Sequence, residues 1–180
     1  MRVTVCFLSA LFLFGCTGVD LAPQSVSNVD FSGTWLIDFG DSDSAPDLRD
    51  QGKRELYRRA RSPVSREALR LGDGSGLTFI AHDFQVLSAD KVDIEQSRDS
   101  MGIRYYPGIY RDISWGDRQR GLWEVEAGWE ENELVVISTA KDLRVVERFV
   151  WTSQDRMRVN VAIDADGEDM AFARSFYRQP

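Results

Sequence analysis

Apolar and polar residues alternate with a period of two through most of the second half of this 180-residue chain, and this alternation constrains its fold more than any other feature. It is typical of β-strands that bury one face. Short, turn-like links separate the alternating stretches, so successive strands should pair antiparallel as a meander. The pattern predicts strands at about 31–39, 83–88, 91–96, 102–106, 109–115, 120–129, 133–139, 143–152, 156–163 and 169–177.

A meander of about 8–10 strands usually curls and closes, because closure removes its exposed edges. We therefore expect a mainly β protein with a single closed barrel domain over residues 30–180. After the first strand, residues 46–71 instead carry apolar side chains at every fourth position, which indicates a helical insert. Pro63 should divide it into helices at about 47–61 and 63–71.

The helical insert is basic, with eight Lys and Arg residues against four acidic ones, although the whole chain has a net charge of −7. Two interpretations stay open for it. It is either a solvated helix that neutralises an acidic barrel, or a surface that lies against anionic lipid headgroups.

The first predicted strand opens with Gly33-Thr34-Trp35. This resembles the Gly-x-Trp signature of lipocalins, which implies a lipocalin-like, calycin-type barrel. The resemblance also implies that an Arg near the last strand packs over the Trp and closes the narrow end of the barrel. Arg174 and Arg178 both lie in the last predicted strand, so either can fill that role. Together with Ser32, the same opening is similar to that of a set of small bacterial lipoproteins.

Residues 1–15 have the layout of a secretory signal, with a positive start, an apolar stretch and a small residue at the end. Leu13-Phe14-Gly15-Cys16 resembles the lipobox of bacterial lipoproteins. That resemblance implies cleavage before Cys16, its acylation, and anchorage in the outer membrane facing the periplasm, because Thr17 follows. Residues 16–29 then form the lipidated Cys and a flexible tether. The alternative is an ordinary cleaved signal followed by an incidental Cys.

The counts of other residue types exclude several kinds of chemistry. The chain has 29 acidic and 22 basic residues, and this negative balance argues against general nucleic-acid binding. With one His and no mature Cys free of the anchor, we find no catalytic constellation and expect no enzyme and no cofactor. Residues 164–169 echo a calcium loop but are too short for an EF-hand, and Asp-Gly between strands favours a tight hairpin, so we expect no metal.

Three charged residues fall on inward faces of the predicted strands, namely Arg111, Glu147 and Arg174. A buried charge is costly unless it is paired. Glu147 can pair with either Arg, or Arg174 can stack on Trp35. Alternatively, an inward Arg binds the carboxylate or phosphate of an amphipathic ligand, or a bulge shifts the register and turns these charges outward.

We therefore expect a lipid-anchored envelope protein that binds or carries an apolar or amphipathic small molecule in a barrel cavity. The candidate ligand-binding residues are Trp35, Arg111, Trp123, Trp129, Glu147, Phe149, Phe172 and Arg174. The alternative is a non-catalytic structural or assembly factor of the envelope that acts through its surface. That alternative predicts a filled barrel and an exposed apolar patch, and protein partners stay open under both.

Overall fold

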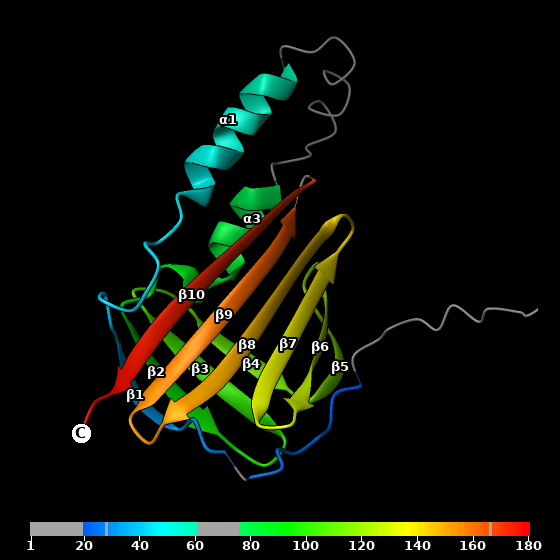
Figure 1. Ribbon diagram of the computed structural model, residues 1–180. Helices are drawn as coiled ribbons and strands as arrows, with labels where there is room; N and C mark the ends of the chain where they lie inside the picture. Colours follow the sequence, from blue (N-terminus) through cyan, green and yellow to red (C-terminus); the bar gives the residue numbers. More distant parts are fainter. Residues whose placement is uncertain (1–19, 28, 61–75, 166) are drawn as a thin grey trace, which may run out of the picture.

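The fold is described by a computed structural model that covers residues 20–27, 29–60, 76–165 and 167–180 (Figure 1). These residues form one ten-stranded antiparallel sheet in the order β4-β3-β2-β1-β10-β9-β8-β7-β6-β5. The strands are β1 (Gly33–Ile37), β2 (Lys91–Gln96), β3 (Ser100–Tyr106), β4 (Tyr110–Ser114), β5 (Gly116–Arg120), β6 (Trp123–Glu130), β7 (Glu133–Ala140), β8 (Leu143–Ser153), β9 (Arg156–Ala165) and β10 (Glu168–Arg178).

The sheet curls into a nearly closed barrel, because the first strand pairs with the last. Trp35 of β1 lies opposite Arg178 of β10 on one side and opposite Val92 of β2 on the other. The two ends of the sheet, β4 and β5, are not paired with each other among the described residues. The predicted mainly β meander and lipocalin-like barrel are therefore confirmed.

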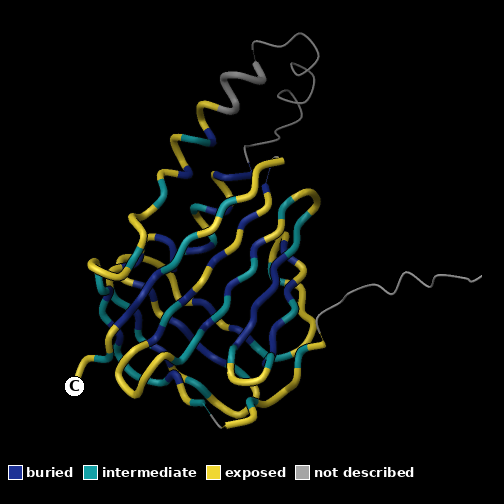
Figure 2. Tube along the Cα trace, in the orientation of Figure 1, coloured by how far each residue is buried: buried dark blue, intermediate teal, exposed yellow. Residues whose placement is uncertain are grey.

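Burial follows the alternation that predicted the strands in β9 and in much of β8, as the change of colour along them in Figure 2 shows, whereas β7 is buried over most of its length. In β9 the inward residues are buried, whereas their neighbours Arg158, Asn160 and Ala162 are not. The same strand pattern places Arg111, Glu147 and Arg174 at 2% exposure or less, so all three predicted inward charges do point inward.

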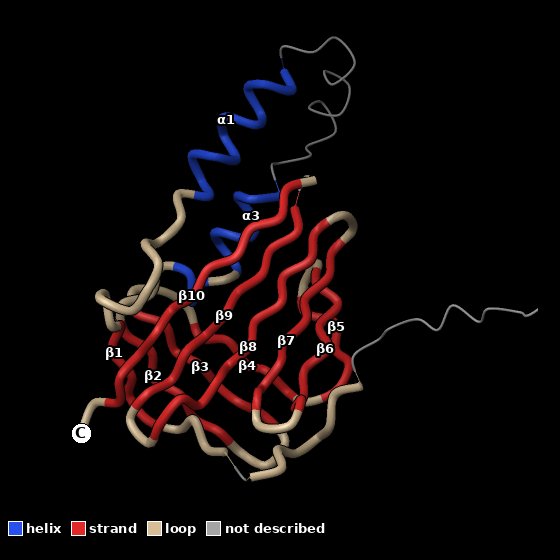
Figure 3. Tube along the Cα trace, viewed as in Figure 1, coloured by secondary structure: helices blue, strands red, loops and turns tan. Residues whose placement is uncertain are grey.

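Helices cover one end of the barrel (Figure 3). The α1 helix (Leu48–Ala60) confirms the first predicted helix and begins after Asp47, whose side chain accepts a hydrogen bond from the Asp50 backbone N–H. The predicted helix at 63–71 lies outside the described residues. A further helix, α3 (Gly76–Asp83), buries Leu77 and Ile80 against the barrel. No helix of the described residues is long and apolar enough to span a membrane.

The structure corrects the predicted strand at 83–88. Residues 76–83 are the α3 helix, and η2 (Gln85–Leu87) is a single 3-10 turn, so His82 lies at the end of a helix rather than at a strand edge. Helical structure thus extends beyond the predicted insert. A short apolar run cannot distinguish a strand from a buried turn by its periodicity, and here the turn sends Val86 and Leu87 into the core.

The β5 strand was not predicted, because its sequence, Gly-Asp-Arg-Gln-Arg, has no apolar alternation. It is a largely exposed strand at an end of the sheet. Such charged edge strands resist unwanted pairing with other chains.

Part of the predicted tether lies against the barrel. Ala22 exchanges two backbone hydrogen bonds of 2.8 Å with Trp129, and Val26 donates one to the carbonyl of Glu131. Leu21 packs over Gly128, where no larger residue would fit without displacing it. Residues 21–26 therefore run along the end of the barrel opposite the helices, so this part of the predicted tether is bound to the barrel.

Candidate functional site

An ion pair between Arg111 of β4 and Glu147 of β8 crosses the barrel interior. Arg111 Nη1 donates to both carboxylate oxygens of Glu147, at 2.7 Å to Oε1 and 2.5 Å to Oε2. The side chains are 1% and 0% exposed. The sequence offered two arginines, Arg111 and Arg174, as the partner of Glu147, and the structure shows that the partner is Arg111. An unpaired charge is costly to bury, so the pairing of Arg111 with Glu147 is what allows both charges to stay inside.

Glu147 uses only one corner of the Arg111 guanidinium. The Nε and Nη2 groups are buried and have no hydrogen-bond partner among the described residues. These two N–H groups form an edge of the planar fork that fits a carboxylate or a carbonyl oxygen. Leaving buried donors unsatisfied costs about 1–3 kcal/mol each, so this free edge is the strongest indication of a binding function in the barrel.

Tyr105 of β3 adds a second unsatisfied group to the same interior. Its hydroxyl is buried and makes no hydrogen bond of normal geometry with the described residues, although it lies close enough to Arg111 to help raise the pKa of that guanidinium. Burial, and then the negative charge of Glu147, hold the pKa of Tyr105 well above its usual value, so the hydroxyl stays protonated and can donate. Burial alone would lower the pKa of Arg111, but Glu147 and Tyr105 together outweigh burial and raise it, so the guanidinium stays charged.

The helical end of the barrel completes this polar centre. Trp123 Nε1 of β6 donates a 2.6 Å hydrogen bond to Asp83 Oδ2 at the end of α3. The neighbouring Phe84 ring lies 5.2 Å from the Arg111 guanidinium and packs edge-on against Trp123 at 5.0 Å. Arg120 is close enough for the positive charge of Arg111, after burial, to lower its pKa.

The opposite end of the barrel is closed by stacked aromatic rings. Phe31 lies within about 6 Å of three other rings, at 6.1 Å from Trp129, 6.2 Å from Phe149 and 5.6 Å from Trp151. Trp35 Nε1 donates to the Phe31 carbonyl at 2.8 Å. The Trp35 indole N–H is therefore hydrogen-bonded, and its ring packs against Trp151.

Arg178 lies 4.6 Å from the Trp35 ring and 5.1 Å from the Trp151 ring. The role that the lipocalin resemblance implied for Arg174 or Arg178 thus belongs to Arg178. Arg174 instead donates to the backbone carbonyl of Asp43 at 2.6 Å and lies 3.4 Å from that of Ala89, so it neither stacks on Trp35 nor pairs with Glu147.

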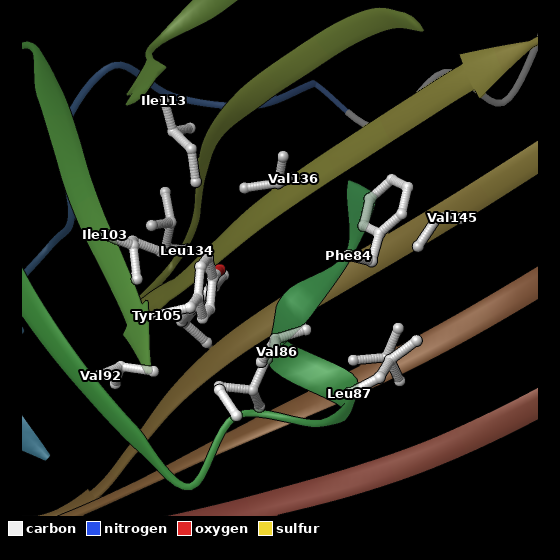
Figure 4. Close-up of a cluster of buried hydrophobic side chains, with 14 of the residues drawn as sticks. Phe84, Val86, Leu87, Val92, Ile103, Tyr105, Ile113, Leu134, Val136 and Val145 are labelled. Atoms are coloured by element: carbon white, nitrogen blue, oxygen red, sulfur yellow. The ribbon is translucent and has the colours of Figure 1, made fainter. Parts of the chain in front are cut away.

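The eight candidate residues therefore separate into groups rather than lining one space. Trp35, Trp129 and Phe149 belong to the aromatic end, and Arg111, Glu147 and Trp123 belong to the polar centre and the helical end. Phe172 is half-buried at the margin of the core, and Arg174 ties β10 to the loop before α1. Side chains fill the interior between these groups, as the buried cluster in Figure 4 shows.

Sequence reasoning missed three residues of the site, namely Tyr105, Asp83 and Phe84. Tyr105 alternates with Ile103 in a predicted strand, so its inward position could have been found. Asp83 and Phe84 could not be placed at the site, because the strand predicted for their segment is in fact the end of α3 and a 3-10 turn.

Openings on the outside of the barrel are shallow. A cleft of about 450 Å³ lies at the aromatic end, between residues 23–25, Arg98 and the rings of Trp115 and Trp129. Among the described residues, no cluster of three or more His, Cys, Asp or Glu side chains could hold a metal ion.

These elements define a small ten-stranded antiparallel barrel with a helical insert after its first strand. Among solved structures, the chain is similar to the wild-type fluorescent protein UnaG, with a TM-score of 0.50 and 14% identity over 83% of this chain and 97% of that one. A substituted UnaG matches with a TM-score of 0.47 and 15% identity, over 83% and 96%. No protein-family model matches the chain, and no curated protein matches it either. The likeness to wild-type UnaG shows a shared fold.

Proposed function

We propose that this chain is a lipid-anchored protein of the bacterial cell envelope whose barrel binds a small amphipathic molecule. The free Nε–Nη2 edge of Arg111 carries the proposal. Together with the nearby Tyr105 hydroxyl, it offers buried N–H and O–H groups that make no hydrogen bond of normal geometry with the described residues. A carboxylate or carbonyl of the ligand would accept these hydrogen bonds, while the apolar walls around them would bury its body.

The net charge of the site sets the kind of headgroup. Glu147 neutralises Arg111, so a ligand carboxylate would add one negative charge to the interior. Arg120 adds a positive charge near Arg111, but Asp83, which is also near Arg120, offsets it. A monocarboxylate or a strongly polarised carbonyl therefore fits better than a phosphate with two charges.

A pair of probes with the same tail tests this proposal. Dodecanoate and dodecanol differ only in the headgroup, and each can be titrated against the full chain carrying Cys16→Ser by displacement of 1-anilinonaphthalene-8-sulfonate. Dodecanoate should bind at least about tenfold more tightly, as expected for charge-assisted hydrogen bonds. Equal affinities for the two probes would contradict the proposal.

The matched control removes the polar centre without leaving a lone charge. In the double variant Arg111→Leu/Glu147→Leu, both buried ions are replaced by apolar side chains of similar combined volume, an exchange that is often neutral or stabilising. Dodecanoate should lose its advantage over dodecanol in this variant. If the advantage survives, the carboxylate binds elsewhere on the protein.

The membrane anchor is proposed from the sequence alone, since Leu13 to Cys16 lie outside the described residues. Cleavage before Cys16 and its acylation would leave two or more chains in the bilayer, which is enough for stable anchoring. Metabolic labelling with a tagged palmitate should mark the wild-type protein in the outer-membrane fraction. A Cys16→Ser variant should lose the label, and retention of the label by that variant would overturn the anchor.

A second function is favoured by the filled interior, because a barrel without a cavity can act through its surface. Tyr106, Ile109 and Tyr110 are 37%, 37% and 51% exposed around the hairpin between β3 and β4. Two results together would replace ligand binding with this surface role. Neither probe binds the barrel, and the double variant Tyr110→Ser/Ile109→Ser no longer retains an envelope protein that the immobilised wild-type chain retains.

A further inference from the structure

The ligand site proposed above is occupied by a piece of the protein itself. We infer that residues 83–87, at the end of α3 and in η2, form a plug that leaves the barrel interior when a ligand binds. This inference rests on the proposed function and adds its regulation. Figure 4 shows Phe84, Val86 and Leu87 projecting from this segment toward the surrounding strands. All three side chains are 3% exposed or less.

Phe84 lies where the body of a ligand would be expected. Its ring centre is 5.2 Å from Cζ of the Arg111 guanidinium, whose Nε and Nη2 groups have no hydrogen-bond partner among the described residues. The contact is apolar and aromatic but offers no hydrogen-bond acceptor, so the plug covers the polar centre without satisfying it. A ligand that brings both an apolar body and an acceptor would make the same packing contacts and add the missing hydrogen bonds.

The plug can move without disrupting the barrel, because its backbone hydrogen bonds are largely internal. The Phe84 N–H donates to the Ile80 carbonyl, the Leu87 N–H to the Phe84 carbonyl, and the Ala89 N–H to the Gln85 carbonyl. These bonds hold α3 and η2 together as a unit. The strands, by contrast, are bound to their neighbours by hydrogen-bond ladders, on both sides for every strand except β4 and β5 at the ends of the sheet.

One side-chain hydrogen bond ties the plug to the wall. Asp83 Oδ2 accepts from Trp123 Nε1 at 2.6 Å, while its Oδ1 lies 2.8 Å from His82 Nδ1 on the same helix. A second, longer contact of 3.4 Å runs from Arg174 Nη2 to the Ala89 carbonyl, just after the plug. We call the Asp83–Trp123 hydrogen bond the latch.

If the plug must leave before the ligand binds, only molecules with the plug out can bind. The apparent affinity for the ligand is then the intrinsic affinity multiplied by the fraction of such molecules. Weakening the latch should therefore tighten binding, whereas most substitutions near a binding site weaken it. For Asp83→Ala we expect the apparent dissociation constant of dodecanoate to fall by about tenfold, which corresponds to the loss of a hydrogen bond to a charged group.

The test measures dodecanoate affinity in the full chain carrying Cys16→Ser, with and without Asp83→Ala. Asp117→Ala is the matched control, because it removes an exposed carboxylate from β5, away from the latch. Tighter binding in Asp83→Ala alone supports the plug. Unchanged or weaker binding in Asp83→Ala, with the wild type still preferring dodecanoate over dodecanol, overturns the plug and leaves the proposed function standing.

Amide hydrogen exchange supplies a second readout that needs no variant. Without ligand, the amides of residues 84–89 should exchange through a partial opening with little dependence on urea, while those of β8 and β9 should exchange only through global unfolding. Dodecanoate should speed exchange at 84–89 and leave β8 unchanged. If residues 84–89 exchange only with global unfolding, the segment is permanent core and the inference fails, whether or not dodecanoate binds.

Discussion

The end of the barrel that carries the C-terminus is closed by aromatic side chains that stand on strands, apart from Phe31 just before β1. The helical end is closed by a segment that belongs to no strand. At the aromatic end, the Trp35 indole donates to the Phe31 carbonyl and its ring lies under Arg178. At the helical end, Phe84 and the latch cover an arginine that still has two unpartnered donors among the described residues.

This difference suggests that the aromatic end stabilises the barrel, while the helical end is the part suited to binding. A closed end built from paired strands should resist opening, because its side chains cannot leave without breaking ladder hydrogen bonds. A closed end built from a short helical segment can open locally. Arg111 has two unsatisfied buried N–H groups near this second end, whereas Arg178 at the aromatic end has only its Nε without a partner among the described residues.

The largest effect that we predict is at the aromatic end. Trp35→Ala removes a fully buried indole with its hydrogen bond and its contact with Arg178, so it should lower the free energy of unfolding by about 5 kcal/mol. Urea denaturation of the full chain measures this loss. Leu122→Ala, at a side chain that is 74% exposed, should cost well under about 1 kcal/mol. Similar losses of stability for Trp35→Ala and Leu122→Ala would show that the aromatic end is not a special source of stability.

The next prediction concerns the polar centre. Glu147→Leu leaves Arg111 charged and buried without its partner, so it should cost about 3 kcal/mol. Arg111→Leu/Glu147→Leu should be close to neutral in stability, because an apolar pair of similar size avoids the desolvation of both ions. A double-mutant cycle in urea gives the coupling energy. Additive losses would show that the two side chains do not act as a pair.

The sequence predicted the part of the fold that depends on alternation. Strands and inward charges follow from a period of two, so the barrel, Arg111 and Glu147 were within reach of sequence reasoning. The choice of Arg111 over Arg174 was not, because both point inward and only the order of strands around the barrel brings β4 opposite β8.

The plug could not be predicted for a different reason. Phe84, Val86 and Leu87 read equally well as a short strand or a buried turn, and α3 follows a glycine-rich stretch that gave no helical signal. The filled interior depends on this segment. The sequence could therefore suggest a cavity but could not show that a part of the chain occupies it.

A smaller effect is expected from Arg178, which covers the aromatic end. Arg178→Ala removes its contacts with Trp35 and Trp151 and should cost about 1 kcal/mol. Arg178→Lys should recover part of this loss, since an ammonium also interacts with a ring face but lacks the planar guanidinium. Thermal unfolding of the three proteins measures the series. If both variants match the wild type, the stacked rings alone close this end.

The smallest effect is a pH dependence on the outer side of β1, next to Trp35. Burial tends to raise the pKa of Asp93, but the hydrogen bond from Thr34 at 2.8 Å and further bonds from Tyr106 and Lys91 outweigh it and hold this pKa below its ordinary value. A carboxylate with a depressed pKa in the folded state stabilises the protein above its ordinary pKa of 3.8, and this contribution is lost as the pH falls through the folded value.

Thr34→Val removes the hydroxyl donor but keeps the branched shape of the side chain. The wild type should be more stable than this variant at pH 5, and the difference should shrink as the pH falls below about 4. Urea midpoints measured from pH 5 to pH 2.5 give the comparison. A difference that stays constant over this range would show that Thr34 stabilises β1 without acting on the Asp93 carboxylate, so the aromatic end would owe its stability to packing alone.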